Sequence, residues 1–464
     1  MRTPDFREMP NLEYLNLFCC KSLEEVDDSL GYCGKLIRLD LGYCSSLKRF
    51  PCVNLESLEY LNLRGCSSLE KFPEIKGRSK LGLEIRMNCS KVRELPSFIL
   101  YLTHLTKLDL SCMENLVSLP SSIGMLKSLV KLDVSYCSKL EILPEEIGDL
   151  ENLEKLDARY TLISRPPSSI ARLNKLKFLS FEKHLEDGVC FEFPQVNDGL
   201  RSLEKLDLSY CNLIDGGLPE DIGSLSSLKK LDLSFCNLID GGLPEDIGSL
   251  SSLEQLHLDG NNFEHLPRSI AQLGALRSLK LRDCERLKEL SEFPQQLDTI
   301  YADWSNDSLC NSLFQNISSL QHGISASDSL RVFTSRMNIP SWFQHWGIDR
   351  SVSVNLPENW YVSDNFLGFA VCYSGSLVET TAQLIPLCDD GMSWMTQKLA
   401  LSNHSKYDIE FCLSTIQFFL VPLAGLWDTS KANGKTPNDY GLFYFLWRNE
   451  ELLDFVCCIK MKRA

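Results

Sequence analysis

One unit of this chain is written twice in a row, and that duplication constrains the fold more than any other feature. Residues 202–228 read SLEKLDLSYCNLIDGGLPEDIGSLSSL, and residues 227–253 read SLKKLDLSFCNLIDGGLPEDIGSLSSL. The copies differ at two positions, Glu204 against Lys229 and Tyr210 against Phe235. A chain can repeat a unit in this way when each added unit simply lengthens a stack, so we interpret the near-identity as a recent duplication of one coil.

The first half of this unit, L-x-x-L-x-L-x-x-C, recurs along the chain. It starts at Leu12, Leu36, Leu58, Leu105, Leu129, Leu153, Leu176, Leu203, Leu228, Leu253 and Leu276. A degenerate copy occupies residues 81–92, and a last copy that matches the motif only in part starts at Leu297. Roughly thirteen copies at intervals of 21 to 27 residues are typical of a leucine-rich repeat.

The spacing within each unit predicts its two halves. In KLDLS the leucines alternate with polar residues, so Leu206 and Leu208 are expected to be buried in a short strand. Pro219, Ile222 and Leu225 have helix-like or 3-10-like spacing, which returns the chain on the other side. The predicted fold is an α/β leucine-rich-repeat solenoid with a parallel inner sheet and a helical or 3-10 convex side.

A cysteine ends the strand motif in most copies. These residues are Cys20, Cys44, Cys66, Cys137, Cys211, Cys236 and Cys284. A short side chain there is expected to turn inward and bond the backbone of the adjacent coil. The alternative, metal or redox chemistry, needs close paired ligands, and no C-x-x-C occurs in the chain. We therefore expect reduced structural thiols and no metal or other cofactor.

Aligning the repeats exposes three outward columns. The basic column is Arg38, Lys107, Lys131, Lys155, Lys205 and Lys230; the acidic column is Asp40, Asp109, Asp133, Asp157, Asp207 and Asp232; the aromatic column is Tyr43, Tyr136, Tyr160, Tyr210, Phe235 and Trp304. In a parallel sheet in register, the basic column lies beside the acidic one, and the charges offset the repulsion within each column. A framework role is the simpler interpretation of these columns.

Residues that break the columns are better candidates for contact with a partner, because aromatic residues and Arg are enriched among binding hot spots. The candidates in the repeats are Tyr14, Phe18, Tyr60, Arg64, Arg159, Phe178, Glu182, His257, Lys280, Arg282 and Tyr301. To these we add four aromatic-column members, Tyr160, Tyr210, Phe235 and Trp304, and three residues beyond the repeats, Trp342, Trp360 and Tyr361. An insertion at residues 184–200 interrupts one return segment, and we expect either a bulge on the binding face or a neutral loop.

The leucine period ends near Asn306. The sequence predicts a solenoid over 1–305, a polar cap or linker over 306–328, and a β-sandwich of jelly-roll or Ig-like type over 329–464. Strand-like runs lie at 351–356, 366–373, 407–413 and 416–421, and a long polar loop is expected over 428–441. The last 23 residues are expected to form an atypical end of this domain.

The combination of both parts resembles a known family. The residues on which the resemblance rests are Ile339-Pro340-x-Trp342-Phe343, Leu356-Pro357-x-x-Trp360 and Phe366-Leu367-Gly368-Phe369-Ala370-x-Cys372, together with the repeat stretches RTPDFREMPNLEYLNL and CSSLKRFP. They are similar to the repeats and post-repeat domain of plant TIR-type nucleotide-binding leucine-rich-repeat immune receptors. The resemblance implies a cytoplasmic sensor, with the nucleus as a second compartment, that binds a pathogen effector protein. It further implies contact with the nucleotide-binding domain of a receptor, in the same chain or another, to hold the receptor inactive.

The resemblance does not extend to the catalytic parts of that family. We find no TIR or nucleotide-binding domain, and Gly434-Lys435-Thr436 has Thr429 where a P-loop needs its first glycine. We therefore expect no enzyme activity and no nucleotide.

The net charge of −15 and pI near 5.1 argue against nucleic acid as a partner, and the most apolar stretch, residues 411–427, is too short and broken to suggest a membrane span. The alternative functions are a general intracellular repeat scaffold or decoy and, if the chain is secreted, a cell-surface ectodomain.

Overall fold

A computed structural model describes most of the chain as two compact units, Met1–Leu253 and Glu254–Ala464. It describes residues 1–54, 56–76, 82–184, 188–213, 216–288, 290, 293–294, 296–302, 331–334, 345–347, 351–361, 366–374, 378–387, 394–399, 416–427, 430–432, 434–448 and 456–462. The domain boundary at residue 305 stays a prediction.

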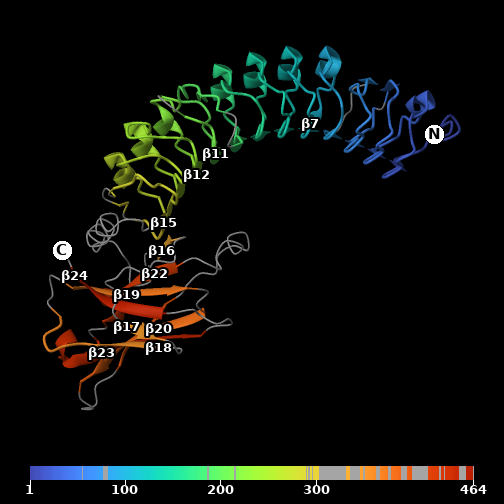
Figure 1. Cartoon of the computed structure of the whole chain (residues 1–464). Coiled ribbons are helices and arrows are strands. Elements are labelled where there is room, and N and C mark those ends of the chain that lie inside the picture. Colours follow the sequence, from blue (N-terminus) through green and yellow to red (C-terminus); the bar gives the residue numbers. More distant parts are fainter. Residues whose placement is uncertain are drawn as a thin grey trace. The chain divides into compact units, whose positions relative to one another are not determined.

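The first unit is a stack of coils, each with one short strand and most with a 3-10 turn opposite it. The strands are β1 (Tyr14–Asn16), β2 (Arg38–Asp40), β4 (Tyr60–Asn62), β6 (Leu83–Arg86), β7 (Leu105–Asp109), β8 (Lys131–Asp133), β9 (Lys155–Asp157), β10 (Phe178–Ser180), β11 (Lys205–Asp207) and β12 (Lys230–Asp232). The 3-10 helices are η1 (Asp28–Tyr32), η2 (Ser97–Tyr101), η3 (Ser121–Met125), η4 (Glu145–Asp149), η5 (Ser168–Arg172), η6 (Ile222–Ser224) and η7 (Glu245–Ser249). A small pair, β3 (Val53–Asn54) and β5 (Ile75–Lys76), lies outside the main sheet. The strands line the inner side of the curved stack, and the 3-10 helices line its outer side (Figure 1).

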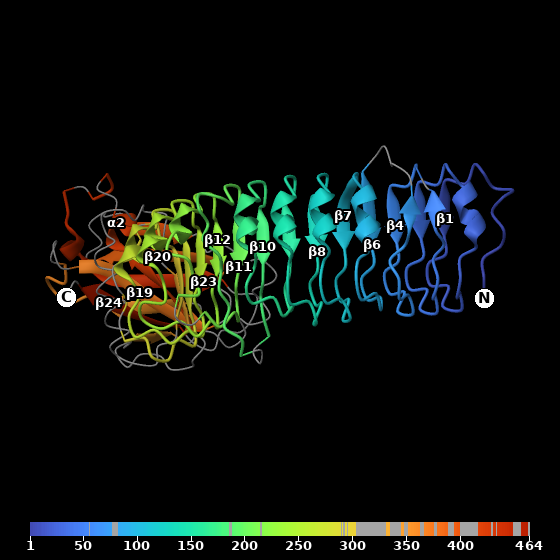
Figure 2. The same cartoon turned by 90° about the horizontal axis from the view of Figure 1, so that it is seen from above.

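Successive strands are parallel and in register, as the alignment predicts. Lys107, Lys131 and Lys155 are direct partners across β7, β8 and β9. Viewed from above, the coils follow one another in a single row (Figure 2). The leucines of the motif, such as Leu108, Leu132 and Leu156, are at most 1% exposed and form one continuous core. The predicted solenoid is confirmed.

The proline of the Leu-Pro dipeptide in each repeat has a local structural role. Pro120, Pro144, Pro167 and Pro244 each precede a 3-10 helix, with φ between −60° and −73°. Proline holds φ in this range and has no N–H to leave unsatisfied at a helix start. The proline therefore sets where each return segment begins.

The cysteine column is inward, as predicted, and each thiol reaches the preceding coil. Cys44 donates to Leu17 O at 3.1 Å, Cys66 to Leu41 O at 3.2 Å and Cys137 to Leu110 O at 3.2 Å. The same bond recurs for Cys211, Cys236 and Cys284. Cys20 is exposed, so it departs from the expectation.

The second unit begins with three more repeat strands, β13 (Gln255–His257), β14 (Ser278–Leu281) and β15 (Thr299–Ala302), and with η8 (Arg268–Gln272). Strand β16 (Arg331–Thr334) pairs parallel with β15 and antiparallel with β22, so one strand joins the repeat sheet to an antiparallel sheet. The antiparallel strands are β17 (His345–Gly347), β19 (Phe366–Ser374), β22 (Ile416–Pro422) and β24 (Val456–Lys462). A separate sheet has the order β18 (Ser351–Asn355), β23 (Tyr440–Arg448), β20 (Val378–Pro386) and β21 (Met395–Leu399). The helices here are α2 (Leu423–Leu426) and η11 (Pro437–Asp439).

These two antiparallel sheets share one apolar core. It includes Phe369 and Val421 from one sheet and Val352, Leu384 and Phe443 from the other. The rings of Phe369 and Phe443 stack at 3.7 Å. The predicted strands at 351–356, 366–373 and 416–421 are therefore present, while 407–413 lies outside the described residues.

The expectation of an atypical end stays a prediction, and the structure describes two strands in this part of the chain. Residues 440–448 form β23, whose Phe443 and Phe445 alternate into the core, and β24 pairs with β19 over seven residue pairs. Strand β24 lies between β17 and β19, with antiparallel pairing to both.

Candidate protein-interaction surface

The inner face of the first unit carries the charged columns beside each other. Lys155 Nζ lies 3.2 Å from Asp157 Oδ2, and Lys230 Nζ lies 3.7 Å from Asp232 Oδ2. Opposite charges on one strand thus offset the like charges stacked across strands.

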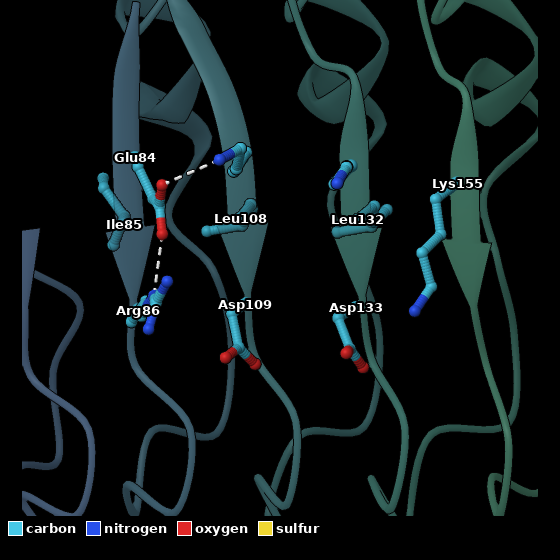
Figure 3. Close-up of a pocket in the computed structure, with 10 residues that line it drawn as sticks. Glu84, Ile85, Arg86, Leu108, Asp109, Leu132, Asp133 and Lys155 are labelled. Atoms are coloured by element: carbon cyan, nitrogen blue, oxygen red, sulfur yellow. Dashed lines mark hydrogen bonds and ion pairs between the residues drawn. The ribbon is translucent and has the colours of Figure 1, made fainter. Parts of the chain in front are cut away.

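A shallow pocket of 240 Å³ lies between the two columns on β6, β7, β8 and β9. Figure 3 shows Glu84 beside Arg86, with Asp109, Asp133 and Lys155 further along. Glu84 accepts from Arg86 Nε at 2.7 Å and from Lys107 Nζ at 3.1 Å. Burial alone raises the pKa of Glu84, but these hydrogen bonds together outweigh it and the pKa is lowered. Burial raises the pKa of Asp133.

Four predicted contact residues meet on the first coils. Tyr14 and Tyr60 flank Arg38 in register, and Arg38 lies over the Tyr60 ring at 4.0 Å. Phe18 makes an edge contact with Tyr43 at 5.5 Å, and Arg64 lies 5.6 Å from the centre of the same Tyr43 ring. We call Tyr14, Phe18, Arg38, Tyr43, Tyr60 and Arg64 the arginine–aromatic patch.

Four others meet on β9 and β10 and the turns that follow them. Arg159 donates to both oxygens of the fully buried Asp157, at 2.8 and 3.2 Å, and its NH1 lies 3.9 Å from Glu182. Tyr160 donates to Glu182 Oε1 at 2.5 Å. Phe178 lies between the ammonium groups of Lys155 and Lys205, at 4.8 and 5.1 Å. We call Arg159, Tyr160, Phe178 and Glu182 the central cluster.

Electrostatics hold the central cluster in one arrangement. The hydrogen bonds to Asp157 raise the pKa of Arg159. Burial and the nearby Asp207 carboxylate raise the pKa of Glu182, against the hydrogen bond from Tyr160. Burial, and then the bond to Glu182, raise the pKa of Tyr160. The Tyr160 ring also lies between Tyr136 and His184, 4.6 Å from each, so a rigid aromatic row borders the charged groups.

The two positions that differ between the duplicated coils face each other. Lys229 Nζ lies 3.1 Å from Glu204 Oε2, and the rings of Tyr210 and Phe235 stack at 4.8 Å. Tyr210 and Phe235 also occupy a backbone position with φ of 61° and 56°. The same left-handed conformation recurs at Tyr43, Tyr136 and Tyr160, and at Gly65 and Gly260 in other coils. Sequence reasoning missed this feature, although the two glycines in an aromatic column were its signal.

The candidates in the second unit are placed less favourably for contact. The ammonium of Lys280 and the guanidinium of Arg282 lie over the Tyr301 ring, 5.3 and 4.5 Å from its centre. Tyr301 is nevertheless buried, and so is His257. Trp304 and Trp342 lie outside the described residues. Trp360 is 5% exposed and donates from Nε1 to Tyr440 O at 2.8 Å, so we correct its assignment from contact residue to core residue. Tyr361 is half-buried and packs against that core.

The described part of the insertion at 184–200 packs onto the coils. Phe191, Phe193 and Val196 are buried, and Phe191 lies 5.5 Å from Phe181. Backbone bonds join Phe193 N to Gly217 O and Glu192 N to Ser164 O. Most of this segment is therefore part of the stack; residues 185–187 lie outside the described residues.

The described part of the chain holds no group of His, Cys, Asp and Glu residues suited to a metal ion. No helix there has the length and apolar character needed to cross a bilayer.

Three family models together match most of the chain. The C-JID domain matches residues 334–462, a leucine-rich repeat region matches 136–241 and 193–322, and the leucine-rich repeats of the RPS4B-like disease resistance protein match 54–147. The C-JID match includes β23 and β24.

Curated relatives come from plants. TMV resistance protein N of Nicotiana glutinosa is 58% identical over 97% of this chain and 40% of its own length. Disease resistance protein RPP2A of Arabidopsis thaliana is 40% identical over 24% of this chain and 8% of its own. Among solved structures, an internalin from Listeria monocytogenes aligns with 65% of this chain and 83% of its own, at 19% identity and a TM-score of 0.42. The chain spans less than half the length of the curated relatives it matches. It belongs to the family of plant TIR-type nucleotide-binding leucine-rich-repeat disease resistance proteins, of which it carries the leucine-rich repeats and the C-JID domain.

Proposed function

We propose that this chain is the effector-sensing and autoregulatory part of a plant intracellular immune receptor. It binds a pathogen protein through the inner face of the repeats and through the C-JID domain, and otherwise helps to hold the receptor inactive in the cytoplasm or nucleus. The kinship with disease resistance proteins supports the immune role.

The observation that carries the proposal is the central cluster. Arg159, Phe178 and Glu182 replace the regular column residues beside Tyr160 of the aromatic column, and hydrogen bonds and ring contacts hold the four side chains in place. Half-buried Arg and aromatic side chains that need no reordering are typical of hot spots at protein interfaces.

The test uses a receptor in which this chain replaces the matched region of its Nicotiana relative. The receptor is expressed in leaves with a panel of pathogen proteins, and both co-precipitation and cell death are scored. We expect one pathogen protein to score in both assays, and Arg159→Ala or Phe178→Ala to abolish both. Lys229→Ala, which removes an exposed ion pair on other coils, is the control and should change neither.

The alternative, a general repeat scaffold or decoy, makes a different prediction. Host proteins would then precipitate equally from infected and uninfected leaves, and no pathogen protein would depend on Arg159. That outcome would replace the sensing proposal with the scaffold.

A further inference from the structure

Two guanidinium groups of the arginine–aromatic patch are positioned by rings and not by acids. Arg38 lies over Tyr60 at 4.0 Å, and Arg64 lies 5.6 Å from the Tyr43 ring centre. Within the part of the chain that the structure describes, neither group forms an ion pair with a carboxylate. Arg159 of the central cluster differs in this respect, because Asp157 holds it through two hydrogen bonds.

The sequence of these coils explains why the acids are missing. At the acidic-column position, β1 and β4 carry Asn16 and Asn62, on either side of Asp40 in β2. Asp40 Oδ1 accepts hydrogen bonds from Gly42 N at 3.0 Å and from Asn62 Nδ2 at 2.8 Å. The one carboxylate of this column segment is thus occupied by its neighbours.

The rim of the patch is apolar and exposed. Tyr14 is 63% exposed, Phe18 49% and Tyr43 40%, although the chain buries most of its other large apolar side chains. Arg38 and Arg64 are exposed as well. The surface therefore offers two cations beside apolar contact area.

We propose that the arginine–aromatic patch is a docking surface for an acidic segment of a partner protein. A guanidinium that rests on a ring keeps its N–H edge free and oriented, so it can hold a carboxylate through two parallel hydrogen bonds. The exposed rings of Tyr14 and Phe18 take apolar side chains of the same segment.

Charge favours a protein partner over nucleic acid. The chain carries a net charge of −15, so a polyphosphate backbone is repelled by most of its surface. A segment with a few carboxylates needs only the local positive site. This surface lies on β1, β2 and β4, whereas the proposed sensing function rests on β9 and β10, so each can fail without the other.

The test measures binding to the full chain by fluorescence anisotropy. The probe is a labelled peptide that combines Glu, Gly and Leu; the comparison probes are the same peptide with Gln for each Glu and a labelled single-stranded DNA. We expect the acidic peptide to bind most tightly. Arg38→Gln and Arg64→Gln should each raise its Kd about tenfold.

Matched variants distinguish binding at this patch from a general effect of positive charge. Arg49→Gln removes one positive charge from the same coils, but Arg49 is paired with Glu25 and Asp28 away from the strands, so it should leave the Kd unchanged. Arg38→Lys keeps the charge and loses the flat, stacked donor, so its effect should be intermediate. Equal binding of the Gln peptide, or unchanged binding by the Arg38→Gln/Arg64→Gln chain, overturns the proposal. Tighter binding of the DNA assigns the patch to nucleic acid instead.

Discussion

At the scale of single residues, a thiol serves as the inward donor in six of the described coils, although it is a weak donor. Its acceptor is a backbone carbonyl one coil earlier that is shielded from water, as at Cys137 and Leu110 O. Burial raises the pKa of Cys66 and of Cys137 to about 12, and that of Cys44 to about 11. These thiols therefore stay protonated and unreactive at neutral pH.

Alkylation measures this difference directly. With iodoacetamide at pH 8, we expect the exposed Cys52 and Cys190 to react and Cys66 and Cys137 to resist until the chain is unfolded. Peptide mapping by mass spectrometry gives the extent at each site. Reaction of Cys137 as fast as Cys190 in the folded chain would contradict the buried, protonated thiol.

The left-handed position of the aromatic column gives a second residue-scale prediction. Tyr136 has φ of 59°, a conformation that Asn tolerates and β-branched residues do not. Tyr136→Val and Tyr136→Asn both lose the contact with Tyr160, so their difference isolates the backbone cost. We expect the Val variant to have a free energy of unfolding lower by about 1–2 kcal/mol than the Asn variant, measured by urea titration. Equal stabilities would mean that this backbone conformation costs nothing extra.

At the scale of elements, the 3-10 turns set how closely coils can stack. A Cβ at Gly148 would lie 2.3 Å from Ser169 O, and one at Gly124 would lie 2.5 Å from Glu146 O. These atoms belong to the backbone of the next turn, which cannot rotate away. The G of the I-G-x-L motif is thus required by the approach of η3 to η4 and of η4 to η5.

Gly148→Ala is therefore expected to separate η4 from η5 and to lower the free energy of unfolding by about 1–3 kcal/mol. Gly34→Ala is the control, because no atom lies within 4 Å of its Cβ position. Urea titration followed by circular dichroism compares the two. Equal midpoints for both variants would show that the coils can shift freely.

At the scale of the whole molecule, stability is distributed in two different ways. Each coil contacts its neighbours, so a local change in the solenoid is felt over a short range. The antiparallel sheets instead share one core, in which Trp360 bonds Tyr440 O and Phe369 stacks on Phe443. Loss of one core side chain there affects both sheets.

Trp360→Ala should test this distinction. We expect faster hydrogen exchange in β18, β19 and β23, because the variant loses a hydrogen bond and opens a cavity. Exchange in β8 and β9 should stay unchanged, as these strands belong to the solenoid. Mass spectrometry of the full chain reads both regions, and faster exchange in β8 would contradict local stability in the repeats.

The repeat positions were predictable because they depend on local periodicity. Leu206 and Leu231 are buried and in register, as the L-x-x-L-x-L spacing indicates. The central cluster was predictable in part, since Arg159, Phe178 and Glu182 visibly break the columns. The contacts that Arg159 makes with Asp157 and Glu182 were not predictable, because they depend on which side chains meet within and across coils.

By itself, the sequence determined the solenoid, the in-register columns and the inward position of six of the seven column cysteines, since each follows from a pattern that recurs along the repeats. Only the tertiary structure decided which exposed groups are paired and which are free. Arg64 and Arg159 occupy the same position of the repeat, yet one lies over the Tyr43 ring and the other is held by a buried Asp157. Likewise Trp360 stands beside Tyr361 in the chain, but the first is buried and the second half-buried. Burial and pairing depend on residues distant in the chain, and a local pattern carries no information about them.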